Sequence, residues 1–318
     1  MYKKVISVFL LVVIVSSLFI TGCSTEEETD DGKINVVATI FPQYDFARQI
    51  AGDKINLKML IAPAGETHTY EPTPQDIISI EKSDVFLYIG GENDEWVEDI
   101  LDSIDTDKTQ VIKLIDYVDT VEEETVEGME SDEEEHSDEG HSVEADEHIW
   151  TSPLNAAKMV NAIKDALCKA DTVNADIYKK NADNYISKLN ELDSKFKEIV
   201  SNSERQELIF GDRFPLVYFT KEYDLTYYAA FPGCSSETEP SASTIAFLTD
   251  KVKEDKVPVV LKIELSNDTV AKTIAEETNA EVLTFYSCHN LTKEQFNNGE
   301  TYLSMMEENV ETLKKALN

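Results

Sequence analysis

Stretches typical of buried strands alternate with stretches typical of amphipathic helices along most of the chain. Apolar runs predict strands at residues 34–41, 55–62, 85–89, 207–210, 225–231, 257–264 and 281–286. Apolar side chains spaced three or four apart predict helices at residues 44–51, 75–82, 96–104, 218–223, 243–254, 270–278, and from about 154 and 301 onward. This alternation is typical of α/β folds with mostly parallel sheets.

One segment in the middle of the chain is much longer than the others. Residues 175–203 contain no Gly or Pro, and apolar side chains recur along one face, which predicts a long amphipathic helix. We therefore expect an α/β protein of two lobes, each with a mostly parallel sheet flanked by helices, joined by this helix. The expected parts are an N-terminal lobe at 34–171, a linker helix at 172–203 and a C-terminal lobe at 204–318.

The first 33 residues have the pattern of an export signal followed by a tether. Lys3 and Lys4 precede an apolar run at residues 5–20, which is shorter than the roughly 20 apolar residues that a membrane-spanning helix needs. We expect residues 1–22 to be a signal peptide, with a single-span anchor as the alternative. Cys23 resembles the lipid-modified cysteine of the bacterial lipobox, and the rest of residues 23–33 suits a flexible tether. The expected location is extracytoplasmic, at the membrane, with lipid on Cys23 as the anchor.

The chain is strongly acidic, with a formal net charge of −35, which argues against nucleic acid as a partner. Residues 121–147 hold fourteen of the acidic residues and no Lys, Arg or aromatic residue. A segment of this composition cannot bury enough apolar surface to fold alone, so we expect a disordered loop. Its two histidines, His136 and His141, are either solvated or weak auxiliary metal ligands.

Cysteine spacing argues against a structural zinc knuckle, because no pair has the CxxC pattern. Cys234 lies in a Pro-Gly turn and Cys288 follows a predicted strand, so we expect these two to form a disulfide in an oxidising compartment. Cys168 lies near the end of a helical pattern and is expected to be a small buried residue.

Three isolated histidines lie in separate segments: His68 in GETHTYEPTP, His148 in DEHIWTSP and His289 in SCHN. Neutral imidazole is the commonest protein ligand for zinc and related metals, and three imidazoles make most of a tetrahedral shell. The segments with His68 and His148 are loops at the ends of predicted elements, where ligands bind in α/β sheets. The histidines therefore predict a metal site built from distant parts of the chain. The alternative for each is an ordinary, partly buried histidine.

Several motifs occur in a fixed order: the lipobox, THTYEPTP, GGENDEWVEDIL, the acidic histidine-containing insertion, HIWTSP and the long helix. In this order they resemble the zinc/manganese substrate-binding lipoproteins of bacterial ABC transporters, of the zinc-uptake type (cluster A-I). The resemblance covers essentially the whole chain after the signal peptide. It implies a monomeric binding protein rather than an enzyme, which holds one metal ion in the cleft between its lobes and passes it to a membrane permease.

The resemblance implies two ligands directly, His68 and His148. The family's third ligand falls on Arg213, whose guanidinium cannot bind a metal, so the neighbouring Asp212 or a distant residue would have to replace it. The fourth family ligand falls a few residues before His289, and we expect His289 to take its place.

Glu264, at the end of a predicted strand, matches a family glutamate near the site. The expectation is that its carboxylate orients an imidazole, with direct metal binding as the alternative.

Zinc is favoured over manganese as the bound ion because imidazole is a softer ligand than the oxygen atoms that manganese prefers. Manganese stays the alternative in the same role. Two other classes of protein stay open at this point. An exported zinc hydrolase would use three histidines and a metal-bound water, although the chain has no HExxH motif. A metal-dependent adhesin would use the ion only structurally.

Overall fold

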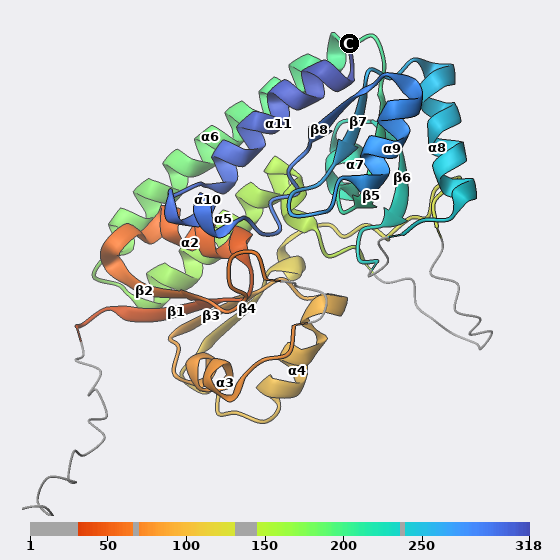
Figure 1. Ribbon diagram of the computed structural model, residues 1–318. Helices are drawn as coiled ribbons and strands as arrows, with labels where there is room; N and C mark the ends of the chain where they lie inside the picture. The colour runs from red at the N-terminus through yellow and green to blue at the C-terminus, as the bar shows by residue number, and fades with distance from the viewer. Residues whose placement is uncertain (1–30, 66–69, 131–144, 236–238) are drawn as a thin grey trace, which may run out of the picture. The chain divides into compact units, whose positions relative to one another are not determined.

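Two four-stranded sheets, one in each half of the chain, form the framework of the fold (Figure 1). The computed structural model describes residues 31–65, 70–130, 145–235 and 239–318. The first sheet has the order β2-β1-β3-β4 and consists of β1 (Ile34–Ala38), β2 (Ile55–Met59), β3 (Val85–Tyr88) and β4 (Gln110–Lys113). The second has the order β6-β5-β7-β8 and consists of β5 (Glu207–Phe214), β6 (Thr226–Pro232), β7 (Val259–Lys262) and β8 (Glu281–Thr284). All neighbouring strands are parallel.

In each sheet the strand that comes first in the chain lies inside, between the second and the third. The loops that leave β1 and β3, and those that leave β5 and β7, therefore diverge at the carboxyl edge of their sheet. This is the position at which open α/β sheets bind ligands.

Helices occupy the connections between the strands. The longer ones are α2 (Phe41–Ala51), α3 (Pro74–Glu81), α4 (Glu95–Leu101), α5 (Pro153–Ala170), α6 (Ala175–Ser201), α7 (Val217–Glu222), α8 (Ala242–Asp255), α9 (Thr269–Thr278), α10 (Lys293–Asn297) and α11 (Tyr302–Ala316). Short 3-10 turns are η1 (Gly52–Lys54), η2 (Glu92–Asp94), η3 (Leu114–Tyr117) and η4 (Ile149–Thr151). Ser152 caps α5, because its side chain accepts a hydrogen bond from the backbone N–H of Asn155.

The long helix α6 packs against α2 and α5 of the first half and against α11 of the second, and Figure 1 shows α6 and α11 side by side along one flank. Its buried face continues into a hydrophobic core that contains residues of both sheets. Phe46 of α2, Tyr185 of α6 and Tyr302 of α11 form one aromatic contact group in this core. The packing gives the loops of both halves a common rigid support.

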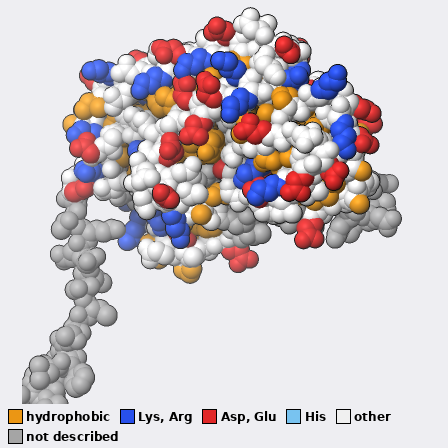
Figure 2. Space-filling model, turned by 45° about the horizontal axis from the view of Figure 1, so that its top comes forward, with side chains coloured by type: hydrophobic (Ala, Val, Ile, Leu, Met, Phe, Trp, Pro, Cys, Tyr) orange, Lys and Arg blue, Asp and Glu red, His pale blue; other side chains and the backbone are white. Residues whose placement is uncertain are grey.

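Two smaller apolar clusters cover the outer faces of the sheets. One lies under α3 and α4 beside the first sheet, and the other under α8 and α9 beside the second. On the face shown in Figure 2, Lys and Arg side chains are interspersed with Asp and Glu, so no large basic patch covers it. No helix in the described part of the chain is long and apolar enough to cross a membrane.

The acidic segment differs from its prediction as a disordered loop. Residues 131–144, with His136 and His141, lie outside the described residues, but both flanks are ordered against the second half of the chain. The backbone N–H of Val121 donates to the Tyr218 hydroxyl, and Glu122 forms an antiparallel bridge with Ala145. Met129 is 9% exposed and joins the core. The prediction considered only whether the segment could fold alone, whereas its flanks are held by contacts with distant residues.

Candidate metal centre

His148 is the best-defined part of the candidate site. It immediately precedes η4, is fully buried, and lies two residues after Asp146, whose Oδ1 accepts a hydrogen bond from the His148 backbone N–H at 2.8 Å. The same oxygen lies 3.3 Å from Nδ1 of the imidazole. Nε2 is buried and has no hydrogen-bond partner among the described residues. A carboxylate on Nδ1 holds the proton there and leaves the Nε2 lone pair for a ligand, as in metal-binding histidines.

Acidic neighbours dominate the electrostatics of His148. Burial alone lowers the pKa of an imidazole, but the carboxylates of Asp146, Glu147 and Glu123 together raise the pKa of His148 above its ordinary value. A cation is therefore favoured at this position, either a proton or a metal ion.

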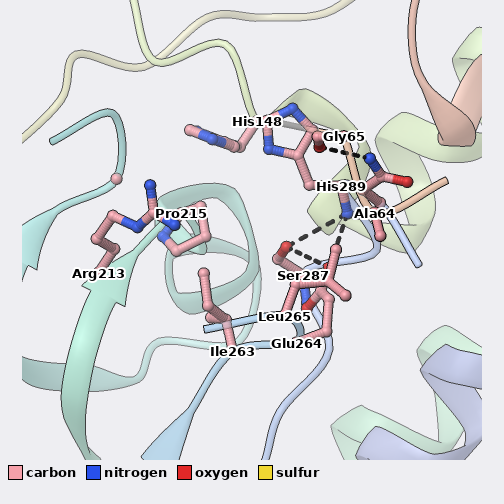
Figure 3. Close-up of a pocket in the computed structure, with 12 residues that line it drawn as sticks. Ala64, Gly65, His148, Arg213, Pro215, Ile263, Glu264, Leu265, Ser287 and His289 are labelled. Carbon is pink, nitrogen blue, oxygen red and sulfur yellow. Dashed lines mark hydrogen bonds between the residues drawn. The ribbon is translucent and has the colours of Figure 1, made fainter. Parts of the chain in front are cut away.

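His289 lies next to His148, at the turn after β8. The centroids of the two rings are 5.5 Å apart, and the rings are nearly perpendicular. The Trp150 ring lies 5.1 Å from that of His289, and its indole N–H donates to the Ser287 carbonyl. Figure 3 shows the two histidines together at one side of a cavity of about 160 Å³. The structure thus brings together two of the three histidines that the sequence singles out.

Glu264 follows β7 and holds the turn that carries His289. Its Oε1 accepts from the backbone N–H of His289 at 2.9 Å and from the Ser287 hydroxyl at 2.8 Å, and its Oε2 accepts from the Ser287 backbone N–H at 2.7 Å. Burial raises the pKa of this carboxyl group, and these hydrogen bonds oppose the rise. In this structure Glu264 therefore positions the backbone of His289.

Asp212 is not among the residues that line the cavity. The strand predicted to end at residue 210 continues as β5 to Phe214, with an irregularity between Phe210 and Arg213. The Asp212 carboxylate accepts from the backbone N–H groups of Arg213 and Ile263 and from the Ser266 hydroxyl. It ties β5 to the end of β7.

Arg213 lines the cavity across from the histidines (Figure 3). Its guanidinium donates to the Ser235 carbonyl at 3.3 Å. A fixed positive charge in this place lowers the electrostatic attraction for a metal ion, which makes the surrounding carboxylates more important.

The loop that leads to His68 reaches the rim of the same cavity. Ala64 and Gly65 line it, and the Asn290 side chain donates to the carbonyls of Ala62 and Gly65. His68 itself lies outside the described residues, as does Cys23.

The predicted disulfide between Cys234 and Cys288 is wrong for this structure, in which both residues are free cysteines, as is Cys168. Cys288 is fully buried in the main hydrophobic core, where the backbone turns inward at a φ of 60°. Cys234 instead faces the side chain of Asn93, whose Nδ2 lies 3.9 Å from the sulfur. Both were placed in loops by the sequence, but the loops direct them to different surroundings.

Sequence reasoning missed the roles of Asp146 and Glu123. Glu123 Oε1 accepts from the backbone N–H of Gly233 at 2.7 Å and raises the pKa of His148. The position of Asp146, two residues before His148, is a local signal for a carboxylate that orients an imidazole. This signal carried little weight in the sequence because many other acidic residues surround Asp146.

The chain matches the family model described as ZnuA, zinc-uptake complex component A, periplasmic, over residues 36–316. The chain belongs to this family. The resemblance predicted from its motifs is therefore confirmed, and so is the fold of two parallel, helix-flanked sheets.

Two relatives and one solved structure illustrate the family match. The chain is 33% identical to the high-affinity zinc uptake system protein ZnuA of Bacillus subtilis over 332 aligned positions, covering 100% of this chain and 99% of that one. It is also 33% identical to the zinc-binding lipoprotein AdcA of Streptococcus pneumoniae over 308 residues, but spans only 60% of that longer protein. The crystal structure of the Zn(II)-bound ZnuA-like domain of AdcA superposes with a TM-score of 0.73 at 30% identity, covering 90% of this chain and 99% of that one.

Proposed function

We propose that this chain binds zinc at His148 and His289 and delivers it to the permease of an ABC transporter. The observation that carries the proposal is the buried His148 Nε2, which has no hydrogen-bond partner among the described residues while Asp146 holds the other ring nitrogen. Leaving a buried polar atom unsatisfied costs about 1–3 kcal/mol. A metal ion bound there removes that cost.

His68 is proposed as a further ligand. Gly65 lines the cavity, and the three residues from Gly65 to His68 span at most about 10 Å, which is enough for an imidazole to reach the ion. The nitrogen-rich donor set fits zinc better than manganese, which prefers oxygen ligands. Glu264 is proposed to support this site through the backbone of His289, and Asp212 through the link between β5 and β7.

The proposed place of action is outside the cytoplasm, with lipid on Cys23 as the membrane anchor and a monomeric chain above it. The role is binding and transfer rather than catalysis. The chain contains no HExxH motif, the pattern with which many zinc hydrolases hold their metal and its bound water.

Titration of metal-free protein tests the proposal. Zn²⁺ should raise the melting temperature at concentrations at which Mn²⁺ has a smaller effect, because a ligand that binds only the native state stabilises it. Replacing His148 or His289 by Ala should lower zinc affinity at least tenfold. The paired change His136→Ala with His141→Ala is the control and should leave that affinity unchanged. If His148→Ala binds zinc like the parent protein, the proposed site is wrong. If Mn²⁺ binds more tightly than Zn²⁺, the metal assignment is wrong.

A further inference from the structure

A sulfur atom lies beside the proposed zinc site. Glu147, His148 and Cys234 each offer one ligand atom, and these three atoms lie within 4.8 Å of one another. They come from separate segments, since Cys234 follows β6 while the other two precede η4. His148 is fully buried and its Nε2 has no hydrogen-bond partner among the described residues, so the group contains an unsatisfied donor atom as well as a thiol.

The loop with Cys234 is pressed against the imidazole. A Cβ atom at Gly233 would lie 3.2 Å from Cε1 of His148, so the absence of a side chain there lets the loop approach. The carboxylate of Glu123 holds the loop in place by accepting from the backbone N–H groups of Gly233 and Cys234.

Glu147 is held in place by Asn93. Its carboxylate accepts from the backbone N–H of Asn93 at 3.0 Å and also from the Asn93 side chain. A Cβ atom at Gly91 would lie 2.8 Å from Cβ of Glu147, so this loop also depends on a glycine for its close approach. The three candidate ligand residues are therefore kept together by contacts from both halves of the chain.

We propose that Cys234 supplies a thiolate ligand to the zinc ion bound at His148, with Glu147 as the neighbouring carboxylate ligand. This inference rests on the proposed function and changes its chemistry, from a site of histidine nitrogen donors to one that also includes sulfur and a carboxylate oxygen. Zinc bonds of about 2.0 Å to nitrogen or oxygen and 2.3 Å to sulfur place these tetrahedral ligands roughly 3.3–3.5 Å apart. The present separations, none above 4.8 Å, therefore need to shorten by at most about 1.5 Å. When the zinc–sulfur bond forms, the thiol proton is released to solvent, and no oxidant or reductant is involved.

The sulfur ligand resolves a problem of charge and ligand number. Arg213 occupies the position at which the family pattern expects a metal ligand, and it cannot bind one. A thiolate restores a ligand and adds a negative charge to the site. Thiolates favour zinc over manganese more strongly than imidazole does, so the ligand also sharpens selection of the metal.

Cobalt titration of the full, reduced chain tests the inference, because Co²⁺ takes the place of zinc and gives a near-ultraviolet charge-transfer band when a thiolate binds it. The band should appear in the parent protein and in Cys168→Ser, the matched control, and should be lost in Cys234→Ser. Zinc affinity measured by chelator competition should fall at least tenfold in Cys234→Ser and stay unchanged in Cys168→Ser.

Two failures are distinguishable. If the parent protein binds Zn²⁺ and Co²⁺ tightly at His148 without a thiolate band, or if Cys234→Ser keeps the band, the sulfur ligand is refuted while the proposed function stands. If neither ion binds with high affinity, the proposed function fails and the sulfur ligand fails with it.

Discussion

Replacing Asp146 separates two ways in which a carboxylate supports zinc binding at His148. Its Oδ1 holds the residue in place, by accepting from the backbone N–H at 2.8 Å and facing Nδ1 at 3.3 Å. Its charge also raises the pKa of the imidazole and attracts the metal ion. Asp146→Asn keeps an oxygen acceptor but removes the charge, whereas Asp146→Ala removes both.

The magnitudes follow from this division. Loss of a group that orients a metal-binding histidine weakens metal affinity about 10- to 100-fold. We expect Asp146→Asn to lie near the lower value, about 1.4 kcal/mol, and Asp146→Ala near the upper value, about 2.7 kcal/mol. The backbone of residue 146 should stay in place in both variants, because the Tyr218 hydroxyl donates to its carbonyl oxygen and not to its side chain.

The pH dependence provides an independent measurement. In the parent protein the pKa of His148 is raised, so protons compete with zinc as the pH falls through this raised value, and affinity decreases. Without the carboxylate charge the pKa falls, and affinity should decrease only at lower pH. Competition titrations at about pH 8 and about pH 6 should therefore show that zinc affinity decreases less between these pH values in Asp146→Asn than in the parent protein. If Asp146→Ala binds zinc like the parent protein at both pH values, the carboxylate has no part in the site.

Three further predictions concern stability and loop contacts. Asp94 is fully buried and has a pKa raised to about 7, first by burial, so its contribution to stability is complete below its unfolded pKa and is lost as the pH rises through 7. The unfolding free energy of the metal-free parent protein should therefore fall between about pH 5 and about pH 8. In Asp94→Asn this fall should be smaller, by about 3 kcal/mol at most, when measured by denaturant titration at both pH values. An equal fall in the two proteins would refute the raised pKa of Asp94. Exchanging residues 131–144 for a Gly/Ser linker of equal length should leave the melting temperature and the zinc affinity unchanged. Removing residues 121–145 should lower both quantities. A fall in zinc affinity in the linker variant would mean that His136 or His141 is a ligand. Glu264→Ala leaves the buried N–H groups of Ser287 and His289 unpaired, so it should lower the unfolding free energy by about 3 kcal/mol and the zinc affinity at least tenfold. Glu264→Gln should give values between those of Glu264→Ala and the parent protein. Equal zinc affinity in the parent protein and both variants would show that the turn needs no carboxylate.

The alternation of strands and helices could be predicted because each element carries its own apolar pattern. β4 was missed because it has four residues, all only partly buried, at the edge of the first sheet. The end of β5 was misplaced for a different reason. Gly211, Asp212 and Arg213 look like a loop, yet Gly211 lets the backbone of Ala271 in α9 approach, since a Cβ there would lie 2.6 Å from its Cα. A contact with a distant helix cannot be seen in the local sequence.

The candidate site was predictable where its chemistry is rare and unpredictable where it is common. His148 and His289 stood out because the chain has only five histidines, and the structure places their rings in contact. Asp146 is one of 63 acidic residues, so its position two residues before a histidine carried little weight. The cysteines show a further limit. The loop positions of Cys234 and Cys288 led to the prediction of a disulfide, but the direction of the Cys288 side chain depends on how its turn packs on the core.

The acids around His148 couple the strength of zinc binding to its sensitivity to pH. Asp146, Glu147 and Glu123 favour any positive charge on or beside the imidazole, so they raise its pKa and attract the metal ion through the same electrostatic field. A buried imidazole without such neighbours would bind zinc less tightly but would release it less readily on acidification. The two properties therefore cannot be adjusted separately by charge at these positions. A neutral replacement at any of the three acids should weaken zinc binding at neutral pH and, at the same time, shift the loss of binding to lower pH.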